Sequence, residues 1–186
     1  MTTLGFTMTF HSPFRVGAAY TSDGVGAALD RDDPLPADSL KGVMRAAAVE
    51  LLGRDHPAVS EVFGGHVRPS AWSWSTAVPS REPDFGQRHR VSIDPNEHAA
   101  RKEALVLGEQ AWMPTARFEV SRLGMLYPDG LAEADHVLLL RCAAAGVHGV
   151  GAWRRRGLGW VGITPDDGEV SAEDVRRLLG MRGAIQ

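Results

Sequence analysis

The chain has 186 residues, enough for one domain with a sizeable hydrophobic core, and a second independent domain is not expected. Its 23 acidic and 20 basic side chains give a formal net charge of -3, which argues against a nonspecific nucleic-acid binder with a global basic excess. The single cysteine excludes a disulfide framework, and no leader-like start or run of about 18 apolar residues is present, so we expect a cytoplasmic protein without membrane contact.

The first predicted strand covers residues 4–10, where apolar and polar side chains alternate. Its apolar face consists of Leu4, Phe6, Met8 and Phe10. Residues 11–33 are rich in Gly, Ala, Ser and Asp, and the prolines at 34 and 36 exclude a helix until just before Asp38. We therefore expect an acidic loop between the first strand and the first helix.

The first helix is predicted to begin at Asp38 or Ser39 and to end at Gly53. Its apolar stripe consists of Leu40, Val43, Met44, Ala47, Leu51 and Leu52. Lys41 and Arg45 share one side of the first turns, although a helix N-terminus favours anions. This cationic pair either binds a docked anion or is solvated.

The segment from 63 to 102 contains Gly, Pro, two tryptophans and several arginines and has no helical period. Trp72 and Trp74 alternate as they would in a strand. Residues 81–90 contain Pro, Gly and Asp and are typical of the tip or flank of a hairpin, with an ordinary surface loop as the alternative. The basic residues at the end of this segment are Arg88, His89 and Arg90.

The last third of the chain contains four further elements. Residues 118–122 and 159–163 predict strands, residues 133–145 predict a largely buried helix that contains Cys142, and a capping box at 171–174 opens a terminal helix. The order of elements predicts an α+β fold of the ferredoxin-like or RNA-recognition-motif class, with a hairpin inserted between its halves.

A glycine- and arginine-rich run connects the buried helix to the last strand. It reads Gly146-Val-His-Gly-Val-Gly-Ala-Trp-Arg-Arg-Arg-Gly-Leu-Gly-Trp-Val161. Its glycines allow backbone N–H groups to surround an anion, its arginines match phosphate geometry, and Trp153 and Trp160 either stack on bases or anchor the loop. The alternative is a hairpin with solvated arginines; the run lacks the features of nucleotide-triphosphate and dinucleotide loops.

Four separated segments resemble the RAMP (repeat-associated mysterious protein) superfamily of CRISPR-associated proteins. They are residues 33–45 with Ser39-Leu-Lys-Gly42, residues 62–64, residues 90–94 with Phe118 downstream, and residues 149–161. Their order and spacing carry the resemblance, which covers about residues 6–163. The chain departs from the usual Gly-Ser-Ser-Leu-Lys-Gly pattern because Ala37 and Asp38 precede Ser39.

The resemblance implies a guide-RNA-binding backbone subunit of a type III CRISPR antiviral ribonucleoprotein. This subunit would be a single RAMP domain over residues 1–186, with a thumb-like insertion at about 66–103. Its partners would be guide RNA, target RNA, copies of itself and other CRISPR effector subunits. The implied RNA-binding residues are Ser39, Lys41, Arg45, Arg88, His89, Arg90, Gly149, Gly151, Arg154, Arg155 and Arg156.

The resemblance also implies an aspartate, in the loop after the first strand, that supports metal-dependent cleavage of target RNA. Asp23 is the first candidate, as catalytic residue and Mg²⁺ ligand, and Asp30 is the second. A carboxylate that holds Mg²⁺ can assist activation of a ribose 2′-hydroxyl. Asp32 and Asp33 are assigned to the turn beside Pro34, and a scaffold that binds RNA without cutting it is the alternative.

Other functions remain open. The chain could be a filament-end subunit of the same complex, or a guide-processing endoribonuclease with His11 or His89 as general acid or base. A small-molecule enzyme would need an apolar pocket with convergent polar groups, for which the sequence offers no motif. The seven histidines include no pair at metal-ligand spacing with a Cys or Glu partner, so zinc is not expected.

Overall fold

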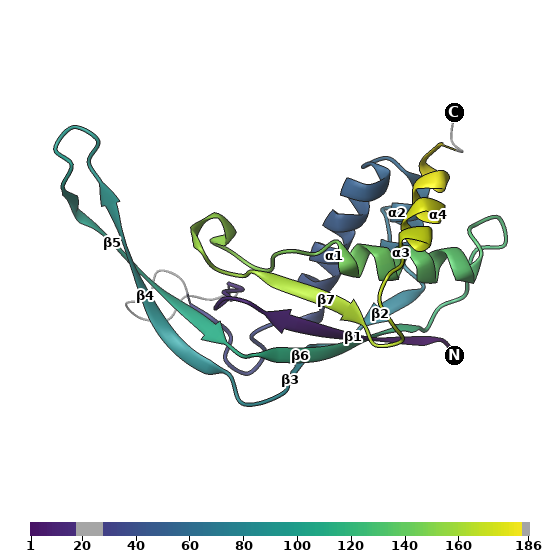
Figure 1. Cartoon of the computed structure of the whole chain (residues 1–186), viewed down its shortest axis with the longest axis horizontal. Coiled ribbons are helices and arrows are strands. Elements are labelled where there is room, and N and C mark those ends of the chain that lie inside the picture. The colour runs from purple at the N-terminus through teal and green to yellow at the C-terminus, as the bar shows by residue number, and fades with distance from the viewer. Residues whose placement is uncertain (18–27, 184–186) are drawn as a thin grey trace.

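The computed structural model describes residues 1–17 and 28–183, which form one antiparallel sheet, helices on one side of it and a long hairpin (Figure 1). The elements are β1 (Thr3–Phe10), α1 (Ala37–Leu52), α2 (Pro57–Phe63), β2 (Trp72–Trp74), β3 (Val78–Pro79), β4 (Asp84–Ile93), β5 (Ala100–Trp112), β6 (Thr115–Arg122), α3 (Glu133–Ala145), β7 (Val161–Pro165) and α4 (Ala172–Gly183). A 3₁₀ turn, η1 (Arg154–Arg156), precedes β7. No helix in these two ranges combines the length and apolar character that crossing a bilayer requires.

The main sheet has the strand order β2-β6-β1-β7, and β3 also pairs with β6. The first and third core strands are therefore central, as expected for two β-α-β halves of the ferredoxin-like class. The register places Phe6 opposite Phe118 and Met8 opposite Ile163. This arrangement confirms the predicted α+β fold.

The core lies between this sheet and the helices α1 and α3. Phe6, Met8 and Phe10 point toward the helices and are buried, as the alternation in the first strand predicts. The rings of Phe6 and Phe118 stack with centroids 5.2 Å apart. The indole of Trp74 donates a hydrogen bond to Sδ of Met44 on α1, at 3.3 Å, and so joins β2 to the helix layer.

The helix boundaries follow the sequence with two differences. Helix α1 begins at Ala37, because Pro36 occupies the N-cap position with φ -68°, and no side chain caps the helix there. Helix α2 has no counterpart among the predicted elements, since seven residues are too few to display a helical period. The capping box of α4 is present, because the Asp174 N–H donates to Oγ of Ser171 and the Ser171 N–H donates to the Asp174 carboxylate.

Strands β4 and β5 form a separate two-stranded hairpin, which projects beyond the main sheet on the side away from α2 and α4 (Figure 1). Its pairing runs from Asp84 opposite Trp112 to Val91 opposite Leu105, with an irregularity before Ile93. The hairpin therefore occupies 84–112, later than the segment of about 66–103 expected from sequence. Trp72 and Trp74 belong instead to the main sheet, where both indoles are buried.

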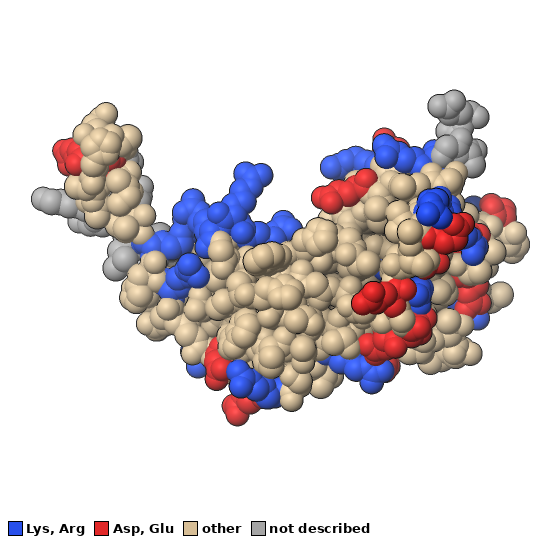
Figure 2. Space-filling model, in the orientation of Figure 1, with Lys and Arg blue, Asp and Glu red and all other residues tan. Residues whose placement is uncertain are grey.

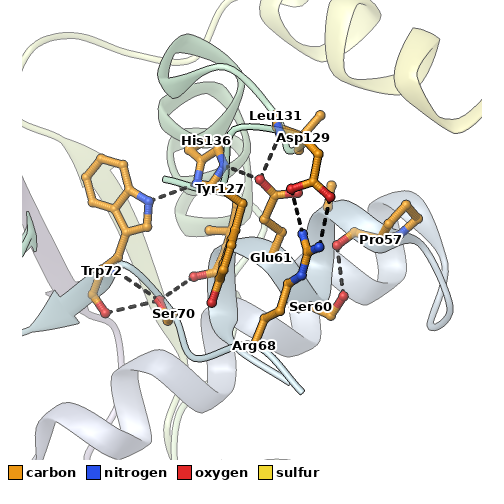
Figure 3. Close-up of polar contacts among 12 residues, drawn as sticks. Pro57, Ser60, Glu61, Arg68, Ser70, Trp72, Tyr127, Asp129, Leu131 and His136 are labelled. Atoms are coloured by element: carbon orange, nitrogen blue, oxygen red, sulfur yellow. Dashed lines mark hydrogen bonds and ion pairs between the residues drawn. The ribbon is translucent and has the colours of Figure 1, made fainter. Parts of the chain in front are cut away.

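A buried polar network joins α2, β2 and α3 at the end of the molecule opposite the hairpin (Figure 3). His136 is 1 % exposed, and its Nδ1 accepts a hydrogen bond from the Trp72 indole at 3.0 Å. Because the indole N–H can only donate, the imidazole carries its proton on Nε2, which donates to Glu61 at 3.1 Å. Glu61 also accepts the Leu131 N–H at 2.7 Å. The network satisfies the polar atoms that packing buries here.

Candidate nucleic-acid interface

The glycine-rich loop is held in place by backbone hydrogen bonds to the chain that follows β1. The Ala152 N–H donates to the Arg15 carbonyl and the Gly159 N–H donates to the Pro13 carbonyl, both at 2.7 Å. Gly151 has φ +73°, and a Cβ there would lie 2.1 Å from the Arg15 carbonyl oxygen. This close approach requires glycine.

These hydrogen bonds change the expected role of the loop backbone. The N–H groups of Val150, Ala152 and Gly159 all donate to carbonyls of the protein itself. They do not form an open cradle of donors for an anion. Gly151 therefore shapes the loop, and these three N–H groups are already occupied by carbonyls of the protein.

The three arginines of this loop, Arg154, Arg155 and Arg156, form the turn η1 and are all exposed. The turn lies between two left-handed residues, Trp153 with φ 60° and Gly157 with φ 79°. A left-handed conformation costs a non-glycine residue about 1–2 kcal/mol, so contacts of the Trp153 side chain have to offset it.

Trp153 anchors the loop to the base of the hairpin. The guanidiniums of Arg15 and Arg90 lie over its ring, at 4.9 Å and 4.6 Å from the centroid. The ring edge contacts β5 at Gly108, where a Cβ would lie 2.3 Å from the ring atom Cη2. Of the two roles that the sequence left open for Trp153, the structure therefore assigns anchoring.

The structure brings together basic residues from two distant segments. Arg88, His89, Arg90 and Val91 of β4 line a shallow pocket of about 280 Å³ with Trp153 and Arg156 of the loop. Arg88 lies opposite Gly108 in the register, so its side chain projects on the face where the Trp153 ring packs. Figure 2 shows Lys and Arg side chains gathered at the base of the hairpin without acidic ones among them. We call this set, Arg88, Arg90, Arg154, Arg155 and Arg156, the basic cluster.

The cationic pair on α1 has a different environment. The Lys41 ammonium lies over the Trp74 ring at 5.2 Å, and Arg45 is exposed one turn further along. The Ser39 N–H donates to the Pro36 carbonyl at 3.0 Å. A groove of about 240 Å³ beside this helix is lined by α1, by residues 146–149 and by Arg154. Arg154 is thus the arginine of the turn that faces α1.

The loop aspartates are only partly described. Asp23 lies outside the described residues. Oδ1 of Asp30 accepts the N–H groups of Asp32 and Asp33 at 3.0 and 3.2 Å, so Asp30 holds the turn before Pro34. Across residues 1–17 and 28–183, no three His, Cys, Asp or Glu side chains gather in a geometry that could hold a metal.

Sequence reasoning missed Glu109 and Arg15, which are both almost buried beside the basic cluster. Glu109 accepts the Leu29 N–H at 3.0 Å and pairs with Arg31 at 2.7 Å, so it ties the end of the acidic loop to β5. The hydrogen bonds from Arg31 and from the Leu29 N–H lower the pKa of Glu109. Burial lowers the pKa of Arg15, an effect that Glu109 opposes. No local pattern marks either residue.

The uncovered face of the main sheet is unsuited to base stacking. In the RNA-recognition motif, aromatic side chains on this face stack on bases. Here the aromatic residues of the described strands of this sheet point toward the helices and are buried; they are Phe6, Phe10, Trp72, Trp74 and Phe118. The open face carries residues such as Thr9, Arg117 and Glu119, and Arg117 pairs with Asp166 at 2.7 Å. The hairpin base is therefore the better candidate interface.

Comparison with known proteins relates the chain to one family. The model of the RAMP superfamily matches residues 7–162. A chain of the type III-B Cmr-beta complex in its apo state superposes with a TM-score of 0.68 at 11 % identity, over 88 % of this chain and 97 % of that chain. A chain of Cmr-beta bound to cognate target RNA gives a TM-score of 0.56 at 19 % identity, over 88 % of this chain.

The present chain spans 60 % of the length of that second protein. At such identities the two superpositions establish a shared fold. No curated protein matches the sequence.

Proposed function

We propose, because this chain belongs to the RAMP superfamily, that it is a guide-RNA-binding subunit of a type III CRISPR antiviral ribonucleoprotein. The observation that carries the proposal is the basic cluster, in which Arg88 and Arg90 of the hairpin meet Arg156 of the loop around one pocket. The fold shared with chains of the type III-B Cmr-beta complex supports the assignment to this kind of assembly.

The chemistry of the cluster favours the RNA backbone as ligand. A guanidinium keeps its charge and presents forked donors that match two phosphate oxygens. Such contacts position RNA without reading its bases, so we expect little sequence preference. Because the net charge is -3, the molecule as a whole does not attract RNA, and we expect the attraction to come from the basic cluster.

The partners we propose are guide RNA, target RNA, copies of this chain and other CRISPR effector subunits. The hairpin supports a place in an assembly, because β4 and β5 extend beyond the main sheet (Figure 1). Val91 and Ile93 on β4 are 47 % and 55 % exposed, which leaves apolar side chains available to neighbouring chains or bases.

RNA binding can be tested by fluorescence anisotropy with a labelled single-stranded RNA over a series of salt concentrations. The test variant carries Arg154→Gln, Arg155→Gln and Arg156→Gln. The matched control carries Arg176→Gln, Arg177→Gln and Arg182→Gln on α4, which removes the same charge elsewhere. Removing one arginine–phosphate pair lowers the salt slope by about 0.7, so the test variant should show a slope smaller by about 2 if all three arginines bind phosphate. Equal affinity and slope for wild type and test variant would refute the proposal.

Cleavage of bound target RNA is a second proposal, with Asp23 ahead of Asp30 as catalytic residue. The observation that favours it is the anchoring of the acidic loop by Glu109 next to the basic cluster, through Leu29 and Arg31. The assembled complex should cut matching RNA in Mg²⁺, and Asp23→Ala should abolish the cuts. Asp30→Asn tests the second candidate, because asparagine retains the turn that Asp30 forms while removing its charge; loss of the cuts in this variant alone would assign the catalytic role to Asp30. Intact RNA with the wild-type complex would exclude cleavage.

A further inference from the structure

Trp160 exposes its side chain although it lies directly after the arginine loop. Its exposed fraction is 65 %, whereas Trp72 and Trp74 are 3 % and 8 % exposed. A single exposed aromatic side chain is common on protein surfaces and by itself indicates nothing. The surroundings of Trp160 are more informative than its exposure.

The backbone of Trp160 is fixed on both sides. Its N–H donates to Oγ of Ser12 and its carbonyl accepts the His11 N–H, both at 2.9 Å. It also forms an antiparallel bridge with Gly149 just before β7 begins. The indole therefore extends from a rigid ribbon, and binding a ligand requires little ordering of the backbone.

The His11 ring contacts the indole edge-on, with centroids 5.6 Å apart and an interplanar angle of 61°. This contact orients the ring without stacking on it, and His11 itself is exposed. A planar ligand can therefore stack on the indole and meet a hydrogen-bonding imidazole beside it.

The same site adjoins the basic cluster through Gly149. Residues paired in an antiparallel bridge project to the same face, so Trp160 points to the side on which Gly149 has no side chain. A Cβ on Gly149 would lie 3.0 Å from Cδ of Arg154. Trp160 and the aliphatic stem of Arg154 thus both approach a position without a side chain, so the indole lies close to the chain that carries the arginine turn.

We propose that Trp160, with His11 beside it, is a stacking site for an unpaired nucleobase of the RNA strand whose phosphates Arg154 contacts. This inference rests on the proposed function and adds a base contact to it. Stacking on an aromatic ring accepts every base, so the site adds affinity without sequence specificity. A protein neighbour that packs on the indole is the competing occupant, but Arg154, Arg155 and Arg156 belong to the same loop and favour a nucleotide.

The test compares two probes of equal length, a single-stranded oligoadenylate and an abasic strand with the same sugar-phosphate backbone. Trp160→Ala should weaken oligoadenylate binding about 5- to 150-fold, the range for removal of one stacked base, and leave binding of the abasic strand unchanged. Trp160→Phe should retain most of the affinity. Met125→Ala is the matched control, because Met125 is also apolar and 90 % exposed but lies in the loop before α3.

Unchanged oligoadenylate binding by Trp160→Ala would overturn the stacking site, and so would an equal weakening on both probes. If that variant instead failed to self-associate in sedimentation while it kept RNA affinity, Trp160 would be a protein contact. The substitution of Arg154, Arg155 and Arg156 separates the two proposals. If it weakens binding of both probes while Trp160→Ala does not, RNA binding stands and the stacking site falls.

Discussion

Gly108 is the point at which the hairpin meets the arginine loop, and Gly108→Ala tests whether this contact supports the interface. The added Cβ would lie 2.3 Å from Cη2 and 2.8 Å from Cζ3 of Trp153. Both atoms belong to a rigid ring that cannot yield as a flexible side-chain end would. The ring therefore has to leave, or the hairpin has to move.

The energetic cost follows from the interactions that Trp153 would give up. A cation–π interaction contributes about 0.5–1 kcal/mol when exposed and about 2 when desolvated. Arg15 is 8 % exposed and Arg90 is half-buried, so the two interactions together contribute about 2–3 kcal/mol. Alanine favours a strand over glycine by about 0.5–1 kcal/mol, which leaves a net destabilisation of about 1–2.5 kcal/mol.

Urea unfolding measures this destabilisation as a lower midpoint with an unchanged slope, and RNA anisotropy measures its effect on the basic cluster. Gly86→Ala on β4 is the matched control, since its Cβ would meet nothing nearer than an atom of Gln110 at 3.8 Å. The double variant with Gly108→Ala and Trp153→Ala should lose much less free energy of unfolding than the sum of the losses in the two single variants. The reason is that the clash needs both side chains. Additive effects, or a wild-type midpoint for Gly108→Ala, would refute the anchoring role of Trp153.

Three further predictions concern buried polar groups. Glu61→Leu leaves the N–H groups of His136 and Leu131 without their acceptor. In urea titrations it should lower the free energy of unfolding by about 2–4 kcal/mol. Glu61→Gln keeps an acceptor oxygen and should be less destabilised. The pKa of Glu109 is lower in the folded protein than the ordinary glutamate value of about 4.3. Its ionised form therefore stabilises the fold fully above that ordinary value, and this contribution is lost as the pH falls through the lowered pKa. Glu109→Gln should therefore have a lower free energy of unfolding than wild type at pH 7 in urea titrations. This difference between the two proteins should narrow toward pH 3, and a difference that stays constant would contradict the prediction. Burial raises the pKa of Cys142 to about 11, so a thiol reagent at pH 8 should label it only after unfolding, and rapid labelling of the native protein would contradict that burial.

Elements whose signal is local can be predicted from the sequence. The alternation in residues 4–10, the helix at 133–145 and the capping box of Ser171 and Asp174 all depend on neighbours within a few positions. Helix α2 escapes such prediction because it is short, and the predicted start of α1 is late because a proline, with no capping side chain, occupies its N-cap. The late start changes only the end of one element, and α2 adds a short helix between α1 and β2; the order of the predicted elements is unchanged.

The sequence by itself determined the ferredoxin-like order of elements and identified the arginine turn and the Arg88 to Arg90 segment as basic. Only the tertiary structure decided that these two segments share one pocket, because residues 88–91 and the arginine turn are more than 60 positions apart in the sequence. Packing of Trp153 against Gly108 brings them together. It also decided that the N–H groups of Val150, Ala152 and Gly159 bond to the protein itself, and that Trp153 is anchored while Trp160 is exposed. The physical reason is that Trp153 and Trp160 are the same residue type in the same glycine-rich run. Their environments differ because different distant segments of the chain pack against them.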